Sequence, residues 1–326
     1  MPSDTLTIGS RGSELALWQA KWVQRELTER FNGLQIEIQI IKTKGDKILD
    51  SPLSKIGDKG LFTREIEIAL LKKKIDLAVH SLKDLPTEFP KGLKLGAICK
   101  REDVRDVFIP HPKNPIKKLL DQPKGAQIAT GSLRRKCQLL NLRPDFQIVD
   151  IRGNLNTRIK KLEESDWAGM ILARAGVVRL GWNDIVGETI DPETMLPAVG
   201  QGALGIEIRQ RDRKVVKYIS VLHHHSTAQA VLAERALLRR LEGGCQVPIG
   251  TYGRMQDGSA DNLLLDAMVG SIDGRKVIRG KIHGPGAEAE TLGKKLAEQL
   301  LAVGAKEILR QIRATSTEVG EAAIAV

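Results

Sequence analysis

Short apolar runs of strand length alternate with segments of helical spacing from residue 6 to residue 181, and this alternation limits the fold more than any other feature. In the first region, the runs at 6–8, 34–41, 75–78 and 93–98 read as strands. Amphipathic segments at 14–31 and 61–73 read as helices. A second region repeats the pattern, with strands at 127–130, 147–151 and 169–173. Strands that alternate with helices favour parallel pairing, so an α/β fold is predicted.

Two segments interrupt the alternation, and we interpret both as crossings between domains. Residues 101–106 are a charged stretch, and the Pro-containing run 110–123 after it predicts a loop with one short helix. Met195–Gly202 is a candidate hinge, and the strand at 203–209 is expected to return to the first sheet. Two crossings would make a hinged two-lobe cleft. The predicted domains are 1–103 with 203–221, then 104–202, and last a small α+β domain, 222–326.

The charge balance indicates an acidic partner. Lys and Arg number 51 against 40 Asp and Glu, and a net charge of +11 attracts nucleic acid, an anionic membrane or an acidic small molecule. Aromatic residues make up only 3% of the chain, which argues against stacking platforms for single-stranded nucleic acid. Three separated cysteines without a CxxC pair suggest neither disulfides nor a zinc site.

No segment predicts export or membrane insertion. Met1–Asp4 leads directly into a strand-like run, so no signal peptide or transit segment is expected. No apolar stretch approaches the roughly 18 to 20 residues that cross a bilayer. We expect a soluble protein of a reduced cytoplasm, and a mature plastid form remains open.

Arginine follows three successive strands of the second region. If these strands are parallel, their junctions with the following helices lie at one edge, where open α/β sheets bind ligands. Arginine binds a carboxylate through a two-pronged fork that lysine cannot imitate. One such junction would be an ordinary solvent-facing helix start, but three predict a site for several carboxylates or phosphates. The arginines are Arg134, Arg135, Arg152, Arg158, Arg174 and Arg179.

The first region carries further cations. Gly9–Ser13 is a turn before a helix, with Ser13 as its expected N-cap and Arg11 near backbone N–H groups that can bind an anion. Residues 42–60 are rich in Lys and Gly. We interpret them as a flexible lid carrying Lys55 and Lys59, with a solvated basic loop as the alternative.

Asp84 stands out as a carboxylate among these cations. It follows a predicted buried strand, in the segment Val79–Pro86, beside Lys83. An ionised carboxylate there could stabilise a cation that forms during a reaction, or move protons. A helix N-cap followed by a turn is the simpler interpretation of this segment.

Two further motifs lie near the start of the third domain. His223–His225 resembles a metal-binding run, but adjacent side chains on a helix do not face one another, so a structural or capping role is predicted. In Glu242–Pro248, paired glycines hold a turn from which Cys245 projects. A buried, inert thiol is the alternative for a lone cysteine.

Taken together, these motifs resemble the porphobilinogen deaminase (hydroxymethylbilane synthase) family, in the family's order and over nearly the whole chain. The resemblance implies two periplasmic-binding-protein-like β/α domains around a hinged cleft and a small C-terminal α+β domain. It also implies a monomer without a metal ion. The motifs are His80–Pro86, Gly131–Arg135, Arg152–Asn154, Leu196–Gly202 and Glu242–Pro248.

The family's reaction is the activity that the resemblance implies. A transferase of tetrapyrrole (heme) biosynthesis joins four porphobilinogen molecules head to tail and releases ammonia at each step. The growing oligopyrrole is built on a dipyrromethane cofactor, bound through a thioether to the cysteine that corresponds to Cys245. The product, hydroxymethylbilane, passes to the next enzyme of the pathway.

The resemblance also implies a role for each candidate residue. Asp84 corresponds to the family's catalytic aspartate, which would stabilise the cations formed on loss of ammonia and on condensation. Six rings carry about a dozen carboxylates, and these are costly to place in a cleft unless each is paired. The residues implied for cofactor or substrate binding are Arg11, Ser13, Lys55, Lys59, Lys83, Ser132, Arg134, Arg135, Arg152, Arg158, Arg179 and Gln201.

Two other classes of protein fit parts of the sequence. A noncatalytic two-lobe protein that binds anionic ligands would share the hinge and the cleft. The missing signal peptide argues against a secreted solute receptor, and the lack of a helix-turn-helix segment before the first strand argues against a regulator. A nucleic-acid binder is suggested by charge alone, and arginines confined to strand-to-helix junctions argue against it.

Overall fold

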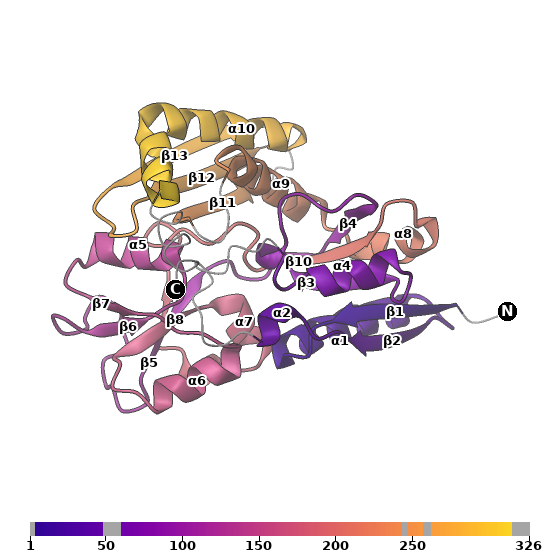
Figure 1. Ribbon diagram of the computed structural model, residues 1–326, viewed down its shortest axis with the longest axis horizontal. Helices are drawn as coiled ribbons and strands as arrows, with labels where there is room; N and C mark the ends of the chain where they lie inside the picture. Colours follow the sequence, from indigo (N-terminus) through magenta and orange to yellow (C-terminus); the bar gives the residue numbers. More distant parts are fainter. Residues whose placement is uncertain (1–3, 48–59, 243–246, 257–261, 315–326) are drawn as a thin grey trace, which may run out of the picture. The chain divides into compact units, whose positions relative to one another are not determined.

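The computed structural model describes residues 4–47, 60–242, 247–256 and 262–314. These residues form two compact units. The first unit contains the residues up to 102 together with 200–228, and the second contains 103–199 and the residues from 229 onward. Three sheets form the framework, one in the first unit and two in the second (Figure 1).

The sheet of the first unit has the strand order β2-β1-β3-β10-β4. Its strand β1 pairs in parallel with β2 and β3, whereas β10 is antiparallel to both β3 and β4. The prediction that residues 203–209 return to the first sheet is therefore confirmed. The strands are β1 (Thr5–Ser10), β2 (Gln35–Ile40), β3 (Leu77–Ser81), β4 (Leu93–Ile98) and β10 (Leu204–Arg209).

Helices cover both faces of this sheet. One face packs on α1 (Glu14–Arg30) and α8 (Arg213–Ile219), through residues such as Val23 and Ile219. The other face packs on α4 (Arg64–Leu71), which contributes Ile66 and Leu70 to a separate cluster with Ala78. Successive side chains of a strand point to opposite faces of the sheet. Because helices cover both faces, nearly every residue of the central strand β3 is buried.

The second unit repeats the same topology in the order β7-β6-β8-β5-β9. In each of these two sheets the antiparallel fourth strand, β10 or β5, is the one that follows a chain crossing. The two β/α domains therefore share the arrangement predicted for a two-lobe protein. The strands are β5 (Asp106–Pro110), β6 (Gln127–Ala129), β7 (Gln147–Val149), β8 (Gly169–Ala173) and β9 (Glu188–Ile190), and the helices are α5 (Leu133–Leu142), α6 (Leu155–Glu163) and α7 (Arg174–Arg179).

The C-terminal part of the second unit is an antiparallel sheet of β11 (Ile249–Met255), β12 (Leu263–Gly270) and β13 (Val277–Gly284). Helices α9 (His225–Arg240) and α10 (Ala289–Leu300) pack on it, and α10 lies along the sheet (Figure 1). A last helix spans 306–314, after a kink at Gly304, whose φ is +115°. The α+β character predicted for this region is confirmed.

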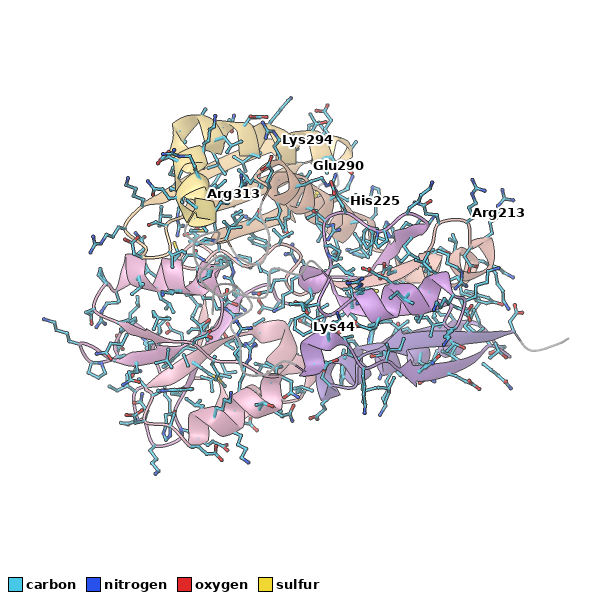
Figure 2. The ribbon with its side chains drawn as sticks, viewed as in Figure 1. Lys44, Arg213, His225, Glu290, Lys294 and Arg313 are labelled. Atoms are coloured by element: carbon cyan, nitrogen blue, oxygen red, sulfur yellow. The ribbon has the colours of Figure 1, made fainter. Side chains whose placement is uncertain are left out.

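The histidine run has the capping role that was predicted for it. Nδ1 of His224 accepts the Thr227 backbone N–H at 3.3 Å and lies 2.9 Å from the Thr227 hydroxyl. Figure 2 labels the next residue, His225, with which α9 begins. His223 accepts the backbone N–H of Ile98 through its Nδ1.

Three local predictions were wrong. Asp106, assigned to the charged crossover, and Pro110, assigned to the loop after it, are the first and last residues of the buried strand β5. The expected short helix in 110–123 does not form, because Asn114 donates its amide to Gln122 and to the carbonyl of Ala168 and so fixes an irregular turn. Part of the expected lid, Lys44–Lys47, is the short helix α2. Residues 48–59 of that lid lie outside the described residues.

Candidate functional site

Asp84 ends a short 3-10 helix, Leu82–Asp84, that follows β3. The strand continues to Ser81, so His80 and Ser81 are strand residues and not part of the turn. Leu82 is buried, and its N–H donates to the carbonyl of Ala203 at 3.0 Å. The Asp84 residue is exposed. The turn is therefore fixed at its base and presents a carboxylate at the end of a central strand, as the sequence predicts.

Arg11 follows β1 in the same unit and is held by two residues that the sequence did not single out. Its guanidinium forms an ion pair with Asp46 of α2, with Nε donating to Oδ1 at 3.0 Å. The ring of Phe62 lies beneath it, 4.3 Å from the guanidinium carbon to the ring centroid. Nη1 has no hydrogen-bond acceptor among the described residues, so one donor of the guanidinium is available for a ligand.

The environment of Asp46 explains why it can hold Arg11. Thr43 donates its hydroxyl to Oδ2 of Asp46 at 2.7 Å. Burial would raise the pKa of Asp46, but the hydrogen bonds from Arg11 and Thr43 outweigh burial and lower that pKa. Ser13 acts as the predicted N-cap of α1, because its Oγ accepts the N–H of Ala16 at 3.4 Å.

In the second unit, the predicted edge of arginines exists. Strand β6 pairs in parallel with both β7 and β8, so the carboxyl ends of the three strands are adjacent. Each is followed by a helix, α5, α6 or α7, whose first turn or approach carries arginine. Ser132 caps α5 by accepting the N–H of Arg135 at 3.4 Å.

Arg134 and Arg135 are buried and share one carboxylate. Nη1 of Arg134 lies 2.8 Å from Oδ2 of Asp106, and Nη2 of Arg135 lies 2.7 Å from Oδ1. Backbone carbonyls of Leu196 and Ile171 accept further hydrogen bonds from the two guanidiniums. Burial would raise the pKa of Asp106, but the charges and hydrogen bonds of the two arginines hold that pKa well below its usual range. Two cations against one anion leave a net positive charge at this place.

The other arginines that the sequence placed at the edge are half-buried. Nε of Arg152 lies 3.5 Å from Oδ2 of the exposed Asp150, and Nε of Arg158 donates to the carbonyl of Gly153 at 2.9 Å. Arg174 forms an ion pair with Asp103, with 3.0 Å between Nε and Oδ2. Arg179 lies in the last turn of α7, so its predicted place at the junction between β8 and α7 is wrong, and only Arg174 lies there.

The candidate residues are divided between the two units, and three of them are not among the residues that the structure describes. Arg11, Ser13, Lys83, Asp84 and Gln201 belong to the first unit, where buried Gln201 accepts a hydrogen bond from Arg101 through its carbonyl. Those of the second unit are Ser132, Arg134, Arg135, Arg152, Arg158 and Arg179. Lys55, Lys59 and Cys245 lie outside the described residues.

The donors at the arginine edge fit a group that carries carboxylates. The Nε atoms of Arg134 and Arg135 are buried and have no acceptor among the described residues. Such donors are costly to leave unpaired, and the two guanidiniums share the single carboxylate of Asp106, so positive charge remains beneath the edge. Within the described part of the chain, no three His, Cys, Asp or Glu side chains are grouped as metal ligands. In the same part, no helix combines the length and the apolar character needed to cross a membrane.

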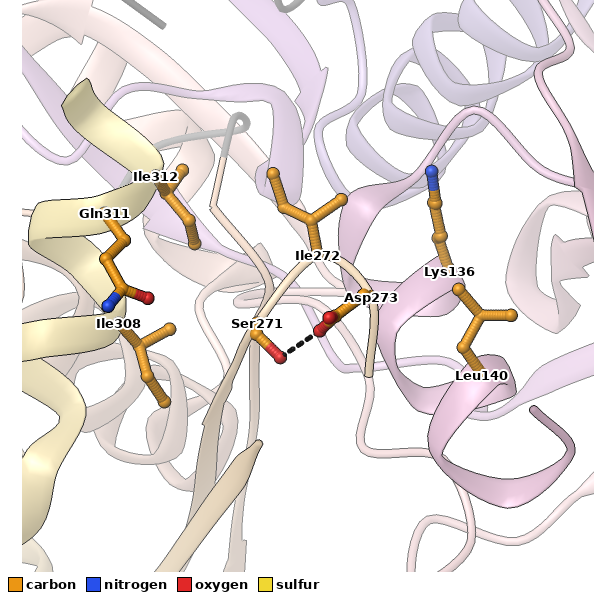
Figure 3. Close-up of a pocket in the computed structure, with 8 residues that line it drawn as sticks. All are labelled: Lys136, Leu140, Ser271, Ile272, Asp273, Ile308, Gln311 and Ile312. Carbon is orange, nitrogen blue, oxygen red and sulfur yellow. Dashed lines mark hydrogen bonds between the residues drawn. The ribbon is translucent and has the colours of Figure 1, made fainter. Parts of the chain in front are cut away.

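The second unit also has an open pocket of about 370 Å³ between α5, the β12–β13 turn and the last helix (Figure 3). Its wall is half apolar, with Leu140, Ile272, Ile308 and Ile312, and half polar, with Lys136 as its one lysine. Ser271 donates its hydroxyl to Asp273 at 2.6 Å there. None of the arginines of the edge lines this pocket, so we place no chemistry in it.

Fold and site together define a class: an α/β protein of two β/α domains with a third small domain, and with an arginine-lined sheet edge suited to acidic ligands. The chain belongs to the porphobilinogen deaminase family. Residues 6–217 match the model described as "Porphobilinogen deaminase, dipyromethane cofactor binding domain", and 228–302 match "Porphobilinogen deaminase, C-terminal domain". The cofactor of this family is therefore dipyrromethane.

Curated relatives agree with this assignment. The porphobilinogen deaminase of Chlorobium phaeovibrioides is 54% identical over 314 residues, covering 95% of this chain and 98% of its own. That of Desulforamulus reducens is 50% identical over 309 residues, with coverage of 95% and 98%. Among solved structures, a probable amino-acid ABC transporter extracellular-binding protein of Bacillus subtilis matches at 12% identity and a TM-score of 0.40, covering 67% of this chain and 90% of its own.

Proposed function

We propose that this chain is a transferase that condenses four porphobilinogen molecules head to tail, with release of ammonia, into the linear tetrapyrrole hydroxymethylbilane. The observation that supports it best is the arginine edge of β7, β6 and β8, where Arg134 and Arg135 share one carboxylate and Arg152 and Arg158 are partly exposed. Each porphobilinogen brings two carboxylates, so a lengthening product needs such donors in number.

In this proposal the side chains divide into binding residues and one reacting carboxylate. Arg134, Arg135, Arg152, Arg158 and Arg179, with Arg11 and Lys83, bind acetate and propionate groups. Ser13, Ser132, Gln201, Lys55 and Lys59 complete the binding set. Asp84 accepts hydrogen bonds from pyrrole N–H groups, stabilises the cation left when the substrate loses ammonia, and assists the final proton loss.

Cys245 is the proposed attachment point of the dipyrromethane cofactor. The bound cofactor supplies the pyrrole carbon to which the first new ring is joined. We propose further that the protein is a cytoplasmic monomer and that hydroxymethylbilane passes to a later enzyme of tetrapyrrole synthesis.

Intact mass spectrometry with and without porphobilinogen tests the function. The purified protein should carry a two-pyrrole adduct on Cys245, give a positive acid-aldehyde colour test, and gain mass one ring at a time when substrate is added. Asp84→Ala should keep the adduct and lose nearly all turnover, and Asp84→Glu should keep part of it. Glu88→Gln, which alters an exposed acid four residues away, is the control and should stay active. A protein without adduct or turnover would overturn the proposal.

A further inference from the structure

Three ionisable side chains are buried together between α4 and the sheet of the first unit. Nε2 of His80, on β3, lies 3.1 Å from Oε2 of Glu207, on β10. Glu67, on α4, interacts electrostatically with both of them. The exposed fractions of the three residues are 6%, 0% and 7%. We call these three side chains the His80 cluster.

The strand register explains why these side chains meet. In the β3–β10 pair, His80 lies opposite Gly205, and Ala78 lies opposite Glu207. Positions two apart on a strand point to the same face, so His80 and Glu207 are diagonal neighbours on one face of the sheet. Ala78 shares that face and packs against the apolar side of α4. Glu67 enters the same buried layer from the helix.

The short contact in this layer joins His80 to Glu207, and Glu67 lies beside that pair. Burial is the main cause that raises the pKa of Glu67, and the carboxylate of Glu207 adds to it, whereas Thr63 and His80 act in the opposite direction. Three other charged side chains belong to α4 and β10. Arg64 is exposed, Glu65 accepts the backbone N–H of Lys44 through Oε1, and Arg209 pairs with Asp76 and Asp212.

Stability alone does not account for such a group. Oε1 of Glu67 and Oε1 of Glu207 are both buried without a hydrogen-bond partner among the described residues. The loss of hydration on burying ionisable groups offsets much of their mutual attraction, and apolar side chains of similar volume often stabilise a core equally well. Buried polar groups can instead select one arrangement of the elements that carry them. A positional role is therefore the better explanation.

The element that the His80 cluster would position is the segment that carries Asp84. His80 is the last residue but one of β3, and the turn Leu82–Asp84 follows at once. Gly205, opposite His80, leaves room for that turn, because a Cβ there would lie 2.7 Å from Cδ1 of Leu82. Strand β10 therefore contacts both the end of β3 and the base of the turn.

We propose that the His80 cluster is a positioning unit for Asp84. The bond from His80 to Glu207, with Glu67 beside it, holds the end of β3 in one register on β10 and so sets where the Asp84 carboxylate lies. The inference rests on the proposed role of Asp84. None of the three side chains contacts substrate in this account, so their loss lowers kcat and leaves the KM for porphobilinogen, set by the cations, nearly unchanged.

The test compares variants of the cofactor-loaded enzyme. In His80→Phe/Glu207→Leu, apolar side chains replace the pair, which should preserve folding. His80→Gln retains an N–H donor for Glu207. His111→Phe is the matched control, because His111 is a buried histidine of the second unit, 8% exposed, whose Nδ1 accepts the Lys113 N–H. For each variant we would measure kcat and KM, corrected for adduct content, and the midpoint of thermal unfolding.

We expect the double variant to lose at least tenfold in kcat with KM within twofold of wild type. His80→Gln should keep kcat within threefold, and His111→Phe should change only stability. A folded double variant with kcat within twofold of wild type overturns the inference. If the double variant does not fold, Glu207→Leu decides, because leucine cannot bond to His80: a kcat loss of fivefold or more supports the positioning role, and a smaller loss overturns it. An inactive wild type would instead overturn the proposed function, so the two failures are distinguishable.

Discussion

Asp106 and Arg134 form a buried ion pair, with 2.8 Å between Oδ2 and Nη1, although 28 residues separate them in the chain. Asp106 is the first residue of β5, the antiparallel strand that follows the first chain crossing. Arg134 lies in the first turn of α5. The pair therefore ties the crossing strand to the arginine edge and fixes the orientation of both guanidiniums there.

Removing the Asp106 charge should destabilise the second unit. Asp106→Asn leaves Arg134 and Arg135 buried without a counter-charge, and breaking a buried pair in this way typically costs about 3–5 kcal/mol. Chemical denaturation of both proteins measures the change in the free energy of unfolding. Asp145→Asn is the control, because Asp145 forms a two-pronged pair with Arg143 near the surface and its loss should cost much less. Equal losses for the two variants would contradict the prediction.

The same carboxylate predicts how stability depends on pH. The pKa of Asp106 is lowered in the folded protein, so the folded state binds fewer protons than the unfolded state, whose aspartate pKa is about 3.9. The stabilisation is therefore fully present above about pH 4 and is lost as pH falls through the folded pKa. Unfolding free energies measured from neutral pH downward should converge for wild type and Asp106→Asn. Curves that stay parallel through the acid range would contradict this.

Much of the fold could be predicted because its signals are local. Apolar runs gave the parallel strands, and the helix at 14–31 was marked by its apolar spacing and by its cap, Ser13. The arginine edge could also be predicted, because it requires only that β6, β7 and β8 be parallel neighbours. The return of residues 203–209 to the first sheet could be predicted because a second crossing between the domains brings the chain back to the first one.

The remaining features depend on contacts between distant residues. Strand β5 begins at Asp106, which ends the charged run 101–106 and was therefore assigned to a crossover. Only its burial against Arg134 and Arg135 shows that it belongs to a strand. Asp46 lies in a polar stretch of the chain, so its role could not be predicted without knowing that it pairs with Arg11. His80 and Glu207 are 127 residues apart in the chain, so no local sequence pattern indicates that they pair.

Asp46 should influence substrate binding through Arg11. It occupies one edge of the guanidinium and holds it over Phe62, so Asp46→Asn should let Arg11 adopt other rotamers and raise the KM for porphobilinogen about threefold to tenfold, as expected for a lost preorganised contact. Steady-state kinetics should show little change in kcat. Glu37→Gln removes the same charge from an exposed position of β2 and should leave KM unchanged. A lower KM in Asp46→Asn would mean that Asp46 competes with the substrate instead of positioning Arg11.

Cys99 and Cys137 should resist alkylation in the folded protein. Both are buried, and burial raises the pKa of Cys137 to about 12, so at pH 8 only about one thiol in ten thousand is the reactive thiolate. Space is also lacking, because a Cβ added to Gly270 would lie 2.2 Å from the Cys137 sulfur. Treatment with iodoacetamide followed by peptide mass mapping should find both thiols unlabelled in native protein and both labelled after denaturation. Labelling of Cys137 at similar rates in the two states would show that the packing between α5 and β12 opens readily.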